Sequence, residues 1–140
     1  MLISRSRPLN SIAPSDSPGA SAAGLDDAAL SRLAELDPTG ENHLLERVLK
    51  AFQTSAARLM PQLDVAHRAG DRDTIRLVAH TLKSSSASIG ALALSQCCAK
   101  LESAILVDPA PVLDGDIAAL SRNLDAALQA IERRLAQRLA

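Results

Sequence analysis

The chain has 140 residues, which is enough for one domain but too few for two of ordinary size. Its formal net charge is −1 and Phe52 is its single aromatic residue, so it lacks the basic excess and the stacking surfaces of nucleic-acid-binding proteins. Ala and Leu dominate the 47% of residues that are hydrophobic, and because both favour helices we predict an all-α domain.

Neither a signal peptide nor a membrane span is evident in the sequence. The opening residues Met-Leu-Ile-Ser-Arg-Ser-Arg-Pro contain no continuous apolar stretch, and no run of about 18 apolar residues occurs later. Cys97 and Cys98 are adjacent within a helical pattern, so their side chains point in different directions and a disulfide between them is not expected. We therefore expect a cytoplasmic protein with no membrane segment.

The first 24 residues are rich in Ser, Pro, Gly and Ala and have no periodic apolar pattern. This composition predicts a disordered N-terminal tail or linker over residues 1–24, followed by a helical domain over residues 25–140. At the start of that domain, Asp26 and Asp27 are both suited to cap a short helix, which should end at the Pro38 and Gly40 interruption.

A long second helix is predicted from about Asn42 to Gly70, which suits its C-terminal cap. Pro61 falls within this span and predicts a kink or a local break. Apolar residues recur along it at spacings of three and four: Leu45, Val48, Leu49, Phe52, Ala56, Leu59, Leu63 and Ala66.

Three further helices follow the same rule. The third should open at Asp71 or Asp73 and end at Gly90, with an inner stripe of Ile75, Val78, Ala79, Leu82, Ser86 and Ile89. The fourth has Ala91, Leu94, Cys98, Leu101 and Ile105 facing inward. After a break at residues 108–111, the last carries Leu113, Ile117, Leu120, Leu124, Leu128, Ile131 and Leu135. Four amphipathic helices with short connections predict an antiparallel four-helix bundle, with the short N-terminal helix as a cover.

His80 is the residue whose position and side chain best suit a nucleophilic role. Successive helical residues advance by about 100°, which places His80 roughly 150° from the centre of the inner stripe and hence toward solvent. A neutral imidazole is a good nucleophile near pH 7, and an exposed one can enter another protein's active site. Lys83 shares this face and can reach phosphoryl oxygens, while Ser84 and Ala87 are small enough to leave space for a partner.

The segment around His80 resembles the signature of the bacterial histidine phosphotransfer (HPt) family. The resemblance rests on Ala79-His80-x-Leu82-Lys83, on the small residues that follow, and on Ile89-Gly90-Ala91. It continues through Leu94-x-x-x-Cys98-x-x-Leu101-Glu102 and backwards over Ala69-Gly70-Asp71. The likeness spans about residues 25–135 and is sharpest over residues 71–102. Where the family commonly has Gly after the lysine, this chain has Ser84, which is also small.

The resemblance implies a four-helix bundle that carries phosphate between receiver-domain aspartates in a two-component phosphorelay. His80 would be phosphorylated and Lys83 would stabilise the phosphoryl oxygens. Independently of the resemblance, helical spacing places Arg76 one turn before His80 and Arg72 one turn further back, so that Arg72, Arg76, Ser84 and Ala87 are candidates for a docking surface. A solvated basic face is the alternative for the basic line of Arg72, Arg76 and Lys83. The implied partners are response-regulator receiver domains, including that of a hybrid sensor kinase. Mg²⁺ is expected on the receiver alone, and the carrier should be a monomer with neither a cofactor nor kinase activity of its own.

Two alternatives to a phosphocarrier remain, an interaction module on the same scaffold and the dimerisation segment of a sensor histidine kinase. An interaction module would bind a receiver without being phosphorylated, although a domain that had lost activity would typically also have lost its histidine. The dimerisation segment of a histidine kinase would have an acidic residue after the histidine, whereas Thr81 follows here, and no nucleotide-binding glycine motif is present. His43 and His67 lack a comparable sequence context, and we expect them to be ordinary surface residues.

Helical bundles often hold metal ions between their helices. Di-iron bundles use Glu-x-x-His pairs, but the residues three positions before His43, His67 and His80 are Gly40, Asp64 and Leu77. We therefore expect no metal site.

Overall fold

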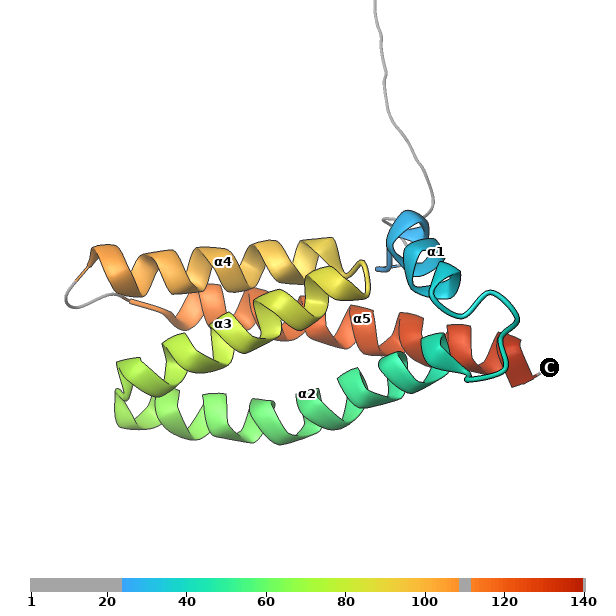
Figure 1. Cartoon of the computed structure of the whole chain (residues 1–140). Coiled ribbons are helices and arrows are strands. Elements are labelled where there is room, and N and C mark those ends of the chain that lie inside the picture. The colour runs from blue at the N-terminus through green and yellow to red at the C-terminus, as the bar shows by residue number, and fades with distance from the viewer. Residues whose placement is uncertain (1–23, 109–111, 140) are drawn as a thin grey trace, which may run out of the picture.

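The computed structural model describes residues 24–108 and 112–139, where the regular secondary structure is entirely α-helical (Figure 1). The helices are α1 (Asp27–Glu35), α2 (Leu44–Ala69), α3 (Arg72–Ser88), α4 (Leu92–Val107) and α5 (Asp114–Leu139). Helix α3 packs against α2 and α4, and α5 packs against α4 and α2, so the four long helices close into a bundle. The predicted all-α architecture, an antiparallel four-helix bundle with an additional short N-terminal helix, is confirmed.

The core is built from the predicted apolar stripes. Every predicted inner residue of α3 and α4 is buried, and α3 and α4 make the most extensive helix–helix contact in the described structure. Small side chains allow this close approach, because Ala79, Ser86 and Cys98 are completely buried between the two helices. The Ser86 hydroxyl donates a hydrogen bond to the Leu82 carbonyl, and burial raises the pKa of the Cys98 thiol to about 12. Cys98 therefore serves as a small core residue, as predicted.

The α2–α3 turn follows the predicted capping. Gly70 ends α2 with a φ of 70°, in the left-handed region that glycine adopts without strain. The Asp71 carboxylate accepts a hydrogen bond from the backbone N–H of Thr74 at 3.2 Å and thereby caps α3. The helix that carries His80 therefore begins at a position fixed by local sequence.

The other end of α2 differs from the prediction. The helix begins at Leu44 instead of near Asn42, because the Asp37 carboxylate reaches across the α1–α2 loop and accepts hydrogen bonds from the backbone N–H groups of both residues. These bonds, above all that from Leu44, hold the pKa of Asp37 below its ordinary value. Of the kink or local break predicted at Pro61, the break is excluded, since α2 continues through this residue. Pro61 is exposed, so the carbonyl that its missing N–H leaves unbonded can be hydrated.

Helix α1 lies across the end of the bundle, near the α3–α4 turn (Figure 1). Its N-cap is Asp26, whose backbone N–H donates a 2.8 Å hydrogen bond to the carbonyl of Gly90, and Leu25 and Leu30 are buried beside it. Residues 1–23 of the predicted tail lie outside the described residues. None of the helices in the described ranges is both long and apolar enough to span a bilayer.

Candidate functional site

His80 lies midway along α3, on the face next to α4. Its side chain is 58% exposed, and its Nδ1 atom is 3.0 Å from Oε2 of Glu102, which projects from α4. The Nε2 atom has no protein partner among the described residues. The sequence-based prediction of an exposed histidine is therefore correct, but one of its two ring nitrogens is held by the neighbouring helix.

Glu102 is the residue that joins the site together. Its side chain is only 14% exposed, and its second oxygen, Oε1, lies 2.7 Å from Nζ of Lys83. The hydrogen bond from Lys83 lowers the pKa of Glu102 more than its burial raises it, and the bond to His80 lowers it further. The carboxylate is therefore ionised at neutral pH and can only accept hydrogen bonds.

An ionised Glu102 determines the tautomer of His80. Because the carboxylate has no proton to donate, the 3.0 Å contact requires Nδ1 to carry the hydrogen. In the neutral ring this leaves the lone pair on Nε2, the nitrogen without a protein partner. The geometry thus leaves Nε2 as the nucleophilic atom of the His80 ring and directs it away from Glu102.

Lys83 is not a free surface charge. Its side chain is 36% exposed and its ammonium is paired with Glu102, one turn along α3 from His80. Its backbone carbonyl accepts a hydrogen bond from the hydroxyl of Ser95, near the start of α4, at 3.0 Å. In the resting protein the carbonyl and the ammonium of Lys83 therefore both bond to residues of α4, and the ammonium pairs with the same carboxylate as the His80 ring.

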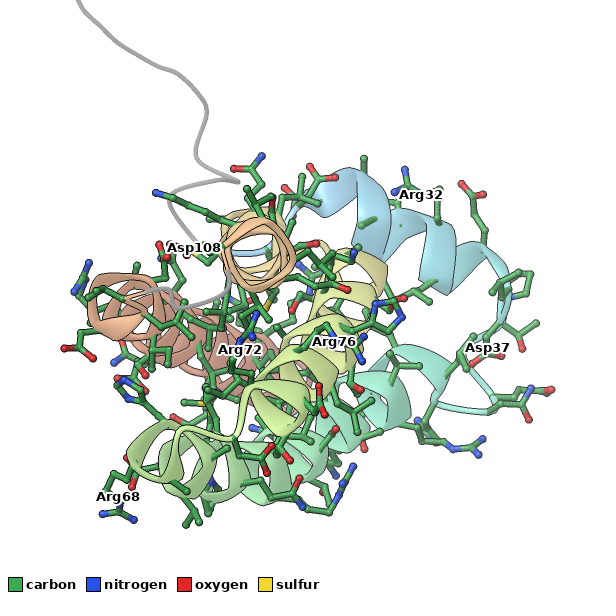
Figure 2. The ribbon with its side chains drawn as sticks, turned by 90° about the vertical axis from the view of Figure 1, so that its left-hand side faces the viewer. Arg32, Asp37, Arg68, Arg72, Arg76 and Asp108 are labelled. Atoms are coloured by element: carbon green, nitrogen blue, oxygen red, sulfur yellow. The ribbon has the colours of Figure 1, made fainter. Side chains whose placement is uncertain are left out.

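The two arginines that were predicted to share a docking surface differ in their surroundings (Figure 2). Nη2 of Arg72 donates hydrogen bonds to the backbone carbonyls of Ile105 at 2.7 Å and Asp108 at 3.1 Å, at the C-terminal end of α4. Arg76 lies one turn further along α3 and is exposed, and no ion pair joins it to any described residue. Of these two arginines, Arg76 is therefore the one whose guanidinium has no hydrogen bond or ion pair to a described residue.

Ser84 and Ala87 are both exposed on the His80 face, as the helical spacing predicted. The hydroxyls of Ser85, Ser86 and Ser88 donate to backbone carbonyls one turn earlier in α3, which satisfies them without interrupting the helix. The side chains at positions 84 and 87 are no larger than serine, so they leave space for a partner next to His80.

The other two histidines lie apart from this site. Nε2 of His67 is 2.7 Å from Oδ1 of Asp114, so this histidine links the end of α2 to the start of α5. His43 is exposed and is the N-cap residue of α2, with a left-handed φ of 51°. Among the described residues, no group of three or more His, Cys, Asp or Glu side chains is arranged to hold a metal ion.

Sequence reasoning did not assign a role to Glu102. The residue was part of the family-like Leu101-Glu102 pair, and it lies next to the inner stripe of α4 on the helical wheel. That position at the edge of the apolar face, together with a histidine and a lysine spaced three apart on the adjoining helix, is the signal that would have found it. What the sequence could not supply is the register of α4 against α3.

Comparisons with known proteins bear on the fold and the family of the chain. The chain is 37% identical over 87 residues to the sensor protein TorS of Escherichia coli (strain K12), a match that covers 62% of this chain and 9% of TorS. Its fold resembles the crystal structure of histidine-containing phosphotransfer protein B (HptB) from Pseudomonas aeruginosa PAO1, with a TM-score of 0.67 and 24% sequence identity over 79% of this chain and 93% of HptB. The model of the Hpt domain family matches residues 47–137, and the chain therefore belongs to the Hpt domain family.

Proposed function

We propose that His80 accepts a phosphoryl group from the phosphorylated aspartate of a receiver domain and passes it to the aspartate of another receiver. The observation that carries this proposal is the Glu102–His80 contact, which places the ring hydrogen on Nδ1 and the lone pair on Nε2. Membership of the Hpt domain family makes the chain a phosphotransfer module. Beyond family membership, we propose which residue is phosphorylated, the direction of phosphoryl transfer and the receiver-domain partners.

The transfer step follows from the tautomer. The Nε2 lone pair attacks phosphorus in line with the aspartyl oxygen, the N–P bond forms, and the P–O bond to the aspartate breaks, leaving a free carboxylate on the receiver. No proton has to leave the ring, because Nδ1–H remains hydrogen-bonded to Glu102. The positive charge that develops on the imidazole is balanced by the Glu102 carboxylate, as the buried carboxylate does for the histidine of a catalytic triad.

Two cations flank the reacting nitrogen. The ammonium of Lys83 reaches the site as a mobile charge that can turn from Glu102 toward the phosphoryl oxygens. Arg76 has no partner among the described residues and is free to pair with phosphoryl or receiver carboxylate oxygens. Phosphoryl transfer depends chiefly on positioning and charge, so a nucleophile and two cations are a sufficient contribution from this chain.

A protein partner suits the shape of the surface better than a small molecule. His80 projects from the exposed face of a helix, and hollows of 390 Å³, lined by residues such as Pro61 and Val65, and 350 Å³, lined by residues such as Cys97 and Lys100, lie elsewhere. A receiver domain would bring its own Mg²⁺ and its own pocket to the exposed Nε2. With the sequence-based expectations, we propose further that the carrier is cytoplasmic and monomeric, needs no cofactor and has no kinase activity of its own.

The test is phosphoryl transfer from a panel of phosphorylated, Mg²⁺-loaded receiver domains to the full chain. We expect label on the wild-type protein that is lost in acid and persists in alkali, as for a phosphoramidate and unlike an acyl phosphate. His80→Gln should take no label yet keep its helical circular dichroism spectrum, because an exposed side chain contributes little to packing. His43→Gln should label normally, and ATP alone should label nothing.

Two results would refute the carrier assignment. One is label that persists in His80→Gln, which would place the phosphoryl group on another residue. The other is a wild-type protein that binds receivers but accepts phosphate from none of the panel, which would identify the chain as an interaction module on the same scaffold.

A further inference from the structure

The C-terminal end of α4 is held by a side chain from another helix. The last carbonyls of a helix have no partner within it, and α4 has no basic residue in its last turn to complement the negative end of its dipole. Arg72, in the first turn of α3, donates hydrogen bonds to the carbonyls of Ile105 and Asp108. Its positive charge thereby also lies at the negative end of the α4 dipole. The guanidinium of Arg72 therefore caps the C-terminal end of α4 from the neighbouring helix α3.

This cap lies close to Glu102 in both sequence and space. Ile105 is three residues after Glu102, which is less than one helical turn, so the two residues move together as part of one rigid helix. At the other end of α4, the Ser95 hydroxyl donates to the Lys83 carbonyl. The two cross-helix attachments lie on either side of Glu102 and fix how far α4 can slide or rotate against α3.

We propose that Arg72 is a positioning residue whose guanidinium, bonded to the end of α4, holds the Glu102 carboxylate against Nδ1 of His80. This role replaces the docking role that the helical wheel suggested for Arg72. The expected effect of Arg72 on phosphoryl transfer rests on the proposed function, whereas its expected effect on the His80 tautomer does not. The tautomer can be measured in the free protein without any receiver.

The primary measurement is the ¹⁵N NMR spectrum of the His80 ring in the full chain at a pH where the ring is neutral. The wild-type protein should show the Nδ1–H form. In Arg72→Gln the cap is weakened, Glu102 is less firmly placed, and the proportion of the Nε2–H form should rise about three- to tenfold, as expected when a hydrogen bond of ordinary strength is lost. Arg72→Lys keeps the charge but not the paired geometry and should lie between the two.

Arg76→Gln is the matched control, because Arg76 is the next arginine on α3 and no hydrogen bond or ion pair joins it to the end of α4. It should leave the tautomer unchanged. For transfer, Arg72→Gln should lower the rate at saturating receiver about three- to tenfold with little change in apparent affinity. In a Glu102→Gln background the same Arg72 change should have no further effect on that rate, because the two residues act through one contact.

Three outcomes would overturn the proposal. One is a folded Arg72→Gln protein with the wild-type tautomer of His80. Another is an Arg72→Gln change that lowers the transfer rate equally in the wild-type and the Glu102→Gln backgrounds. The third is a loss confined to receiver affinity, which would return Arg72 to the docking surface. If Arg72→Gln does not fold, Arg72→Lys is the deciding variant, and an unchanged tautomer in it would also refute the role. Failure of labelling in the wild type would refute the proposed function and leave the NMR test standing.

Discussion

Replacing Gly90 with alanine tests how α1 is fastened to the bundle. Gly90 has a φ of 79°, and an added Cβ would lie 2.7 Å from the backbone nitrogen of Asp26 and 2.9 Å from its carbonyl oxygen. Both are backbone atoms, so the start of α1 would have to move and the 2.8 Å hydrogen bond from Asp26 to the Gly90 carbonyl would be lost. Left-handed strain of about 1–2 kcal/mol and a lost hydrogen bond of about 1 kcal/mol together predict a loss of about 2–3 kcal/mol in the free energy of unfolding.

Gly70→Ala separates these two contributions. Gly70 has a similar φ of 70°, but an added Cβ would meet nothing within 4 Å, so only the strain of about 1–2 kcal/mol applies. Urea denaturation followed by circular dichroism gives both values, provided that the slope with denaturant is unchanged. Equal losses in the two variants would show that α1 does not depend on its contact with the α3–α4 turn.

Three further predictions concern charged groups. Lys83→Ala should keep the fold but slow transfer to His80 by a factor equivalent to about 1–3 kcal/mol, and unchanged kinetics would reduce Lys83 to a bystander. Because the folded-state pKa of Glu102 is lowered, its ionic contacts stabilise the protein above the ordinary glutamate pKa. The stability advantage of the wild type over Glu102→Gln should therefore shrink as the pH falls below about 4.3, and an advantage independent of pH would contradict this. Asp37→Asn should lower the melting temperature at neutral pH, with a difference that fades below about pH 3.9; a constant difference would argue against the lowered pKa of Asp37.

The helices and the exposed histidine could be predicted because their signals are local. The spacing of apolar residues defines the inner face of each helix, and His80 follows from that face by rotation alone. Gly70 and Asp71 mark the α2–α3 turn through backbone conformations and caps that involve only a few neighbouring residues. These features need no knowledge of the tertiary packing.

The features that were missed all depend on contacts between segments. Arg72 lies on the predicted face of α3, but its guanidinium bonds to α4, which a single helical wheel cannot show. Asp37 caps a helix that starts seven residues later, through a loop whose path the sequence does not determine. The contact of Glu102 with His80 depends likewise on the register of two helices, which is set by the close packing of small residues such as Ala79 and Cys98.

The sharing of one carboxylate by His80 and Lys83 has a consequence for the energy of the phosphorylated state. In the resting protein Glu102 and Lys83 cancel each other's charge. A phosphoryl group brings nearly two negative charges to a site whose one lysine is already engaged by a carboxylate. If Lys83 turns to the phosphoryl oxygens, Glu102 loses its strongest partner. If Lys83 stays on Glu102, it neutralises less of the phosphoryl charge than a free lysine would. On the proposed function, competition between Glu102 and the phosphoryl oxygens for Lys83 therefore reduces the electrostatic stabilisation of the N–P-bonded state, which favours onward donation of the phosphoryl group.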